Sequence, residues 1–172
     1  MMFDGAYCYT GGRPFDPQLP TIVFIHGAQN DHSVWALQSR YFAHHGFGVL
    51  APDLPGHGRS TGPALASVEA MADWLLALLD QAGVQRALLA GHSMGSLIAL
   101  EAAFRAPQRV GALALLGSTY PMRVSEALLE VYADDGMTLD QLMAFSVSSD
   151  HVRQEQVWAD VSQTYPNQPH SI

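Results

Sequence analysis

Residues 91–95 read Gly-His-Ser-Met-Gly and join a short apolar run, residues 87–90, directly to a helical pattern. A serine hydroxyl is a weak nucleophile unless the backbone holds it exposed beside a base and a site for negative charge. A sharp turn from strand to helix provides that support, and Gly91 and Gly95 lack the Cβ atoms that would clash in so tight a bend. The pattern therefore predicts acyl transfer through Ser93.

Short apolar runs alternate with amphipathic patterns along the first two thirds of the chain. We expect strands at residues 21–25, 49–51, 87–90 and 112–116, and helices at residues 33–45, 67–82 and 94–105. Such alternation is typical of right-handed crossovers, so the sequence predicts an α/β fold with a predominantly parallel sheet and flanking helices. A short antiparallel hairpin from residues 6–9 and 13–15 is expected at the edge of this sheet.

Composition narrows the partners that the chain can take. With 8 basic residues against 16 acidic ones the net charge is −8, which argues against nucleic acid and anionic membranes as partners. All eight basic residues are arginines, which excludes mechanisms that depend on a lysine. The single Cys8 excludes an internal disulfide. No apolar run approaches a membrane span and the first residues lack a signal-peptide pattern, so we expect a cytoplasmic protein.

Three loops carry further motifs: residues 24–28 read Phe-Ile-His-Gly-Ala, residues 53–60 read Asp-Leu-Pro-Gly-His-Gly-Arg-Ser, and residues 91–95 follow the third strand. In this order, the three loops resemble those of the α/β-hydrolase family. Each loop is expected at the carboxyl end of a strand, where open parallel sheets bind their ligands. The resemblance covers about residues 21–118 and implies a serine hydrolase core.

The resemblance also implies an oxyanion hole built from two backbone N–H groups. One belongs to Met94, which follows the nucleophile at the positive end of its helix. The other, by resemblance, belongs to Ala28. Further residues of these motifs are expected to support the site without taking part in the chemistry: His26, Gly27, Gly91, His92 and Gly95.

The remaining catalytic groups are not assigned. In the family the triad runs serine, acid, histidine along the chain, so both partners are expected after Ser93, yet no candidate follows a predicted strand. We expect residues 1–120 to form the N-terminal part of the core. By the same resemblance, we expect residues 121–172 to form part of a helical cap with a disordered tail, without the C-terminal strands of the family. We therefore expect a fragment or a truncated gene product.

Several alternatives stay open at this point. Ser93 is also compatible with an ordinary helix N-cap, His26 with a brace for the loop after its strand, and Asp53 with a structural role. The leading hypothesis is a hydrolase of small esters, thioesters, lactones or amides, with no metal or cofactor implied. A C–C bond hydrolase or perhydrolase of the same fold, a non-catalytic binding module and a dinucleotide-binding domain are the alternatives. The sequence leaves the oligomeric state and the exact substrate open.

Overall fold

One six-stranded sheet organises the part of the chain that the computed structural model describes, residues 1–118. Its strand order is β1-β2-β4-β3-β5-β6. The strands are β1 (Met2–Phe3), β2 (Ala6–Tyr9), β3 (Thr21–Ile25), β4 (Gly48–Pro52), β5 (Ala87–His92) and β6 (Val110–Leu116). The helical segments are η1 (His32–Trp35), α1 (Ala36–Ala43), α2 (Val68–Gln81), α3 (Met94–Arg105) and η2 (Pro107–Arg109).

The four central strands are parallel, as the apolar runs predict. β3 pairs with β4 on one side and with β5 on the other, and β6 pairs with β5. Every residue of β3 and of β4 is buried, which explains why these strands read as continuous apolar runs rather than alternating ones. The predicted α/β class with a mainly parallel sheet is confirmed.

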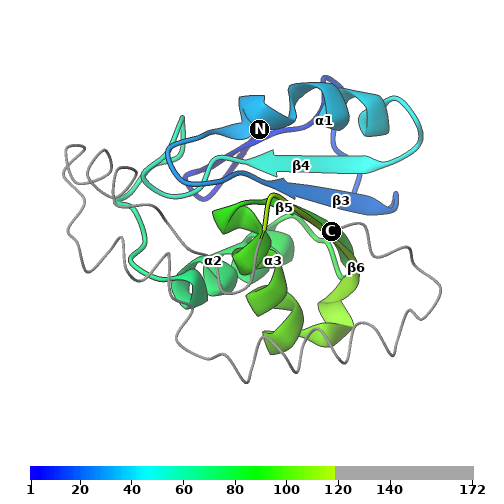
Figure 1. Cartoon of the computed structure of the whole chain (residues 1–172). Helices are drawn as coiled ribbons and strands as arrows, with labels where there is room; N and C mark the ends of the chain where they lie inside the picture. Colours follow the sequence, from blue (N-terminus) through cyan, green and yellow to red (C-terminus); the bar gives the residue numbers. More distant parts are fainter. Residues whose placement is uncertain (119–172) are drawn as a thin grey trace.

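Helices cover both faces of this sheet. In Figure 1, α1 lies on one side of the strands and α2 and α3 lie on the other. Successive side chains of β3 alternate between the two layers, because a strand has a period of two. Ile22 and Phe24 join the cluster that contains Trp35, whereas Val23 and Ile25 join the larger cluster under α2 and α3.

The antiparallel hairpin was predicted with the wrong partner. β2 pairs with β1, not with residues 13–15, and it joins the parallel strands through β4. Asp4 and Gly5 both have positive φ, 43° and 83°, which is the backbone of a two-residue hairpin turn. That Asp-Gly pair was the sequence signal for the correct hairpin. β1 is too short to show any alternation of its own.

The helix predicted over residues 33–45 is also divided. Asp31 accepts the Ser33 N–H at 2.8 Å and starts η1, and α1 begins only after Trp35. The helix predicted over residues 67–82 is confirmed, with Ser67 accepting the Ala70 N–H at its start. No helix within residues 1–118 is long and apolar enough to cross a bilayer.

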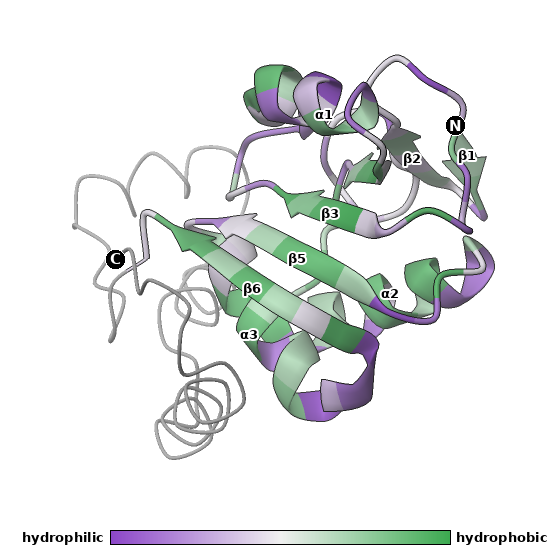
Figure 2. Ribbon diagram, turned by 90° about the vertical axis from the view of Figure 1, so that its right-hand side faces the viewer, coloured by the Kyte–Doolittle hydropathy of each residue, from purple (hydrophilic) through white to green (hydrophobic). Residues whose placement is uncertain are grey.

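β6 lies at the outer edge of the sheet (Figure 2). Of the strands in residues 1–118, only β5 pairs with it. The cap helices predicted within residues 121–172, the disordered tail and the domain limit at residue 120 lie outside the described residues and stay predictions.

Candidate active site

Ser93 occupies a strained backbone corner between β5 and α3. Its φ of 53° with ψ of −119° lies outside the conformations that L-residues ordinarily adopt, and such strain costs on the order of 1–3 kcal/mol. The Ser93 N–H donates to the carbonyl of Leu116 at 2.9 Å, and the Ser93 carbonyl accepts the Ser96 N–H at 2.9 Å. β6 and α3 therefore fix this corner from its two sides.

The hydroxyl of Ser93 is not used to cap the helix. Although Ser93 occupies the N-cap position of α3, its side chain makes no capping hydrogen bond. Within residues 1–118 this hydroxyl has no hydrogen-bond partner at all. The strained backbone at Ser93 therefore positions a hydroxyl that makes no hydrogen bond to any of the described residues.

Two glycines let the corner close. A Cβ at Gly91 would lie 2.2 Å from the Gly95 carbonyl oxygen, and a Cβ at Gly95 would lie 2.2 Å from the Ile25 carbonyl oxygen. Backbone atoms cannot move away as the end of a flexible side chain can, so any other residue would push the elements apart. The start of α3 thus lies directly against the end of β3.

The loop after β3 passes beside Ser93. A Cβ built on Gly27 would lie 3.3 Å from the Ser93 Cβ and 3.3 Å from the His92 carbonyl oxygen. Ala28 follows in this loop and packs partly buried against the core. Neither the Ala28 N–H nor the Met94 N–H has a hydrogen-bond partner within the described part of the chain. Within residues 1–118, both N–H groups are therefore available to donate to a ligand.

His26 ties the beginning of this loop to the turn after β4. The Leu54 N–H donates to His26 Nε2 at 3.0 Å, so the proton of the neutral ring is on Nδ1, which lies 2.7 Å from the Gly27 carbonyl oxygen. Burial lowers the pKa of His26 to about 4, which keeps the ring neutral near pH 7. The ring also packs against His57, with centroids 5.1 Å apart.

A second contact ties the end of the loop to the same turn. Asp53 is fully buried, and its Oδ1 accepts the His32 N–H at 2.7 Å and lies 2.8 Å from His32 Nδ1. Its Oδ2 accepts the Arg59 N–H at 2.8 Å. From the sequence, Asp53 is compatible with a structural role, and the sequence patterns did not single out His32. The signal that was missed is a histidine at the start of a helical segment, together with an aspartate directly after a neighbouring strand.

His92 has a different environment from His26. It is exposed at the end of β5, and a Cβ at Gly117 would lie 3.2 Å from its Nε2. No histidine or carboxylate within residues 1–118 hydrogen-bonds to the Ser93 hydroxyl. The described residues thus include a candidate nucleophile and two candidate amide donors, and the base and acid stay unassigned.

One group of side chains has the composition of a metal site. Ligand atoms of Asp31, His32 and Asp53 lie within 4.8 Å of one another. Their own hydrogen bonds account for this proximity, because both Asp53 oxygens and the Asp31 carboxylate already accept N–H groups. We therefore assign no metal role to this group.

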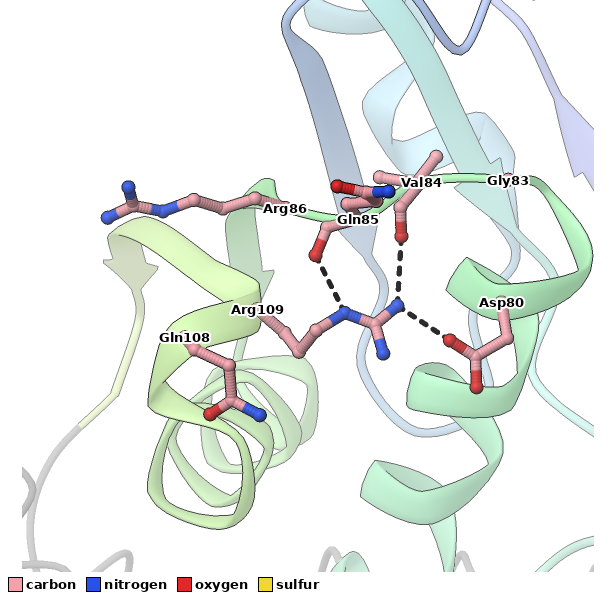
Figure 3. A pocket seen from close by; sticks show the side chains of 7 residues that line it. All are labelled: Asp80, Gly83, Val84, Gln85, Arg86, Gln108 and Arg109. Atoms are coloured by element: carbon pink, nitrogen blue, oxygen red, sulfur yellow. Dashed lines mark hydrogen bonds and ion pairs between the residues drawn. The ribbon is translucent and has the colours of Figure 1, made fainter.

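An open pocket lies at the other end of the sheet (Figure 3). Arg109 dominates it and donates to the carbonyls of Val84 and Gln85 at 2.8 and 2.7 Å, with Asp80 2.7 Å away. The pocket adjoins the start of β5, whereas Ser93 follows its end, and six strand residues span about 20 Å. The Arg109 side chain is occupied by these structural contacts, so we place the candidate site at the Ser93 end of the sheet.

Known proteins resemble this chain in sequence and architecture. Residues 20–170 match the family model of the alpha/beta hydrolase fold. An epoxide hydrolase of Caballeronia sordidicola is 32% identical over 151 residues, covering 86% of this chain and 45% of that protein. The (E)-2-((N-methylformamido)methylene)succinate hydrolase of Acinetobacter baylyi is 36% identical over 100 residues, covering 58% of this chain and 38% of that protein.

The fold agrees with these sequence matches. A carboxylesterase structure from the thaumarchaeon Nitrososphaera gargenis superposes with a TM-score of 0.63 at 24% identity, covering 75% of this chain and 47% of that one. The chain thus spans less than half the length of each of these three proteins. The family match includes the parallel strands and the loops at their carboxyl ends. This chain belongs to the α/β-hydrolase fold family.

Proposed function

We propose that this chain is a serine hydrolase that forms an acyl-enzyme on Ser93 with a small ester, thioester, lactone or amide. The observation that carries the proposal is the corner at Ser93, where a non-glycine residue has φ 53° and ψ −119° and a hydroxyl without a structural bond among the described residues. Strain of this kind persists where the surrounding structure enforces it, and it gathers at functional sites. Two glycine contacts and the bond to Leu116 enforce it here.

The neighbouring amides support the same chemistry. Attack on a carbonyl carbon produces an oxyanion, which needs preorganised N–H donors at about 2.7–3.1 Å. The Met94 N–H is at the positive end of α3, and the loop that carries the Ala28 N–H passes beside Ser93. In the proposed reaction the Ser93 Oγ attacks the carbonyl carbon, the two amides hold the oxyanion, and the leaving group departs. Water then releases the acid.

The general base and the acid are not assigned to residues in this proposal. The mechanism requires a base that takes the Ser93 proton and returns it to the leaving group. By the family resemblance, an epoxide-opening reaction is expected to use an aspartate at the nucleophile position. This chain has Ser93 there, which supports that chemistry less well. A C–C bond hydrolase or a perhydrolase would use the same serine and is an alternative for the substrate class.

A non-catalytic binding module is the second candidate from a different class. The observation that favours it is the Ser93 hydroxyl, which has no base beside it within residues 1–118. A site that has lost its base can still bind an acyl compound through the two amides. The test below separates binding from catalysis, since only an activated serine forms a covalent bond.

A fluorophosphonate probe tests the proposed nucleophile directly. In the protein expressed from its natural gene, we expect the Ser93 Oγ to attack phosphorus and expel fluoride, while the serine proton passes to the base. Intact mass and peptide mapping then detect one phosphonyl group on Ser93. Ser93→Ala abolishes the modification, and Ser33→Ala, which removes an exposed serine of η1, leaves it unchanged. A folded protein that is not modified would favour the binding module.

A further inference from the structure

The loop between β3 and η1 is held at both of its ends by two consecutive residues of the turn after β4. At its start, His26 accepts the Leu54 N–H at 3.0 Å and lies 2.7 Å from the Gly27 carbonyl oxygen through Nδ1. At its end, the His32 N–H and Nδ1 both contact Asp53 Oδ1, at 2.7 and 2.8 Å. The short segment that contains Ala28 is therefore held in place on both sides by hydrogen bonds to the turn after β4.

The sheet order explains why these points matter for Ser93. β3 lies between β4 and β5, so the turn after β4 contacts the loop from one side and Ser93 approaches it from the other. The loop itself includes Gln29 with φ of 59°, a backbone conformation that a non-glycine residue seldom adopts unless it is held there. The backbone conformation of a loop with such a residue depends on the hydrogen bonds that hold its two ends.

The anchor at Asp53 is itself tightly built. Asp53 is 0% exposed, and a Cβ at Gly58 would lie 2.2 Å from its Oδ2. The Arg59 N–H donates to this oxygen at 2.8 Å, and the Ser60 hydroxyl donates to the Asp53 carbonyl at 2.6 Å. The rings of Tyr7 and Tyr9 lie against His32, with centroids 5.1 and 5.6 Å away. These contacts fix the position of the Asp53 carboxylate, and the carboxylate in turn fixes the position of the His32 imidazole.

We propose that Asp53 is a positioning residue for the reaction: by holding His32 through two hydrogen bonds to one oxygen, it fixes the Ala28 N–H relative to Ser93. This inference rests on the proposed function and extends it to the residue that sets one half of the oxyanion hole. Asp53 does not touch the reacting atoms. Its effect is on the chemical step, because a donor displaced from the oxyanion stabilises the transition state less.

The test separates positioning from folding by measuring two quantities with one fluorophosphonate probe. The final stoichiometry of labelling counts the folded, competent molecules, and the rate constant of labelling reports the chemistry within them. For Asp53→Asn we expect full stoichiometry with a rate constant lowered about 10-fold to 100-fold, somewhat less than the loss of a complete oxyanion donor. A purely structural role would lower the stoichiometry and leave the rate constant unchanged, which would overturn the proposal.

Two further variants complete the design. His32→Ala removes the imidazole contact but keeps the backbone N–H, so we expect it to lower the rate constant by a smaller factor than Asp53→Asn does. Asp73→Asn makes the same chemical change at an exposed ion pair on α2 and is expected to label like the wild type. If Asp53→Asn fails to fold by circular dichroism, His32→Ala decides, and an unchanged rate constant there overturns the inference. If the wild type itself does not label, the proposed function fails first and this inference fails with it.

Discussion

The imidazole of His26 is a titratable group that folding keeps neutral. Burial lowers its pKa from 6.5 to about 4, and both ring nitrogens are used in the neutral form. Protonation would place a second N–H on Nε2, facing the Leu54 N–H, and would break the bond that anchors the loop after β3. The protein must therefore unfold, or lose this anchor, to take up the proton.

The stability of the protein is accordingly expected to depend on pH through His26. Between pH 6.5 and about pH 4 the unfolded chain binds a proton at this residue and the native state does not, so the free energy of unfolding falls as pH falls. The loss amounts to about 3 kcal/mol once pH is below both values. Urea unfolding across this range measures it.

A matched pair of variants isolates the contribution of His26 from that of the carboxylates. In His26→Gln the slope of stability against pH should become shallower, whereas His44→Gln, which changes an exposed histidine beyond α1, should keep the wild-type slope. Identical slopes for all three proteins would show that His26 is not held neutral by the fold.

At the scale of elements, the close contact between α3 and β3 gives a second prediction. Gly95→Ala would place a Cβ 2.2 Å from the Ile25 carbonyl oxygen and 2.7 Å from the His26 carbonyl oxygen. We expect it to lower the free energy of unfolding by about 3 kcal/mol or more, in the range of severe overpacking. Chemical denaturation followed by circular dichroism gives the value.

The control for this substitution is a glycine in a strand with room for a methyl group. At Gly111 in β6 the nearest atoms to a built Cβ are 3.4 Å away, the distance of ordinary contact. Gly111→Ala should therefore change stability by less than about 1 kcal/mol, with a small gain because glycine loses more entropy on folding. Equal losses for the two variants would contradict the packing that is described for the corner.

Elements differ in how far the sequence determines them. The strands β3 and β4 follow from apolar runs because every residue in them is buried. The strands β5 and β6 also follow from apolar runs, although each has at least one exposed position. The helix α2 follows from its apolar stripe and its Ser67 cap. The β1–β2 hairpin did not follow, since pairing depends on the turn at Asp4 and Gly5 and β1 has only two residues.

The candidate site likewise has one part that the sequence predicts and one part that it does not. The corner at Ser93 can be recognised from a short motif, because its two glycines lie within five residues, although Gly95 is required by its contact with Ile25 of β3. The pair of His32 and Asp53 is 21 residues apart in sequence and meets only after β3 and β4 have paired. A contact of that kind depends on register and burial, and a single sequence shows neither.

At the scale of the whole molecule, the sheet that residues 1–118 form has two edges that differ in kind. One edge is β1, with two residues, and the other is β6, with seven residues that run Val-Gly-Ala-Leu-Ala-Leu-Leu. Short edge strands offer few unpaired backbone groups, whereas a long apolar edge is a template for another strand. Ala114 and Leu116 of β6 are exposed, and within residues 1–118 nothing but β5 pairs with this strand.

We therefore expect the 172-residue chain to associate through β6 as its concentration rises. Ala114→Lys should reduce this association, because a lysine on an edge strand must stay solvated and opposes the approach of a second strand. Gln81→Lys adds the same charge at an exposed position at the end of α2, so it separates the effect of the edge from that of a lower net negative charge. Light scattering over a concentration series compares the three proteins. A wild-type chain that stays monodisperse and monomeric throughout, or equal association of both variants, would show that β6 is not an open edge in solution.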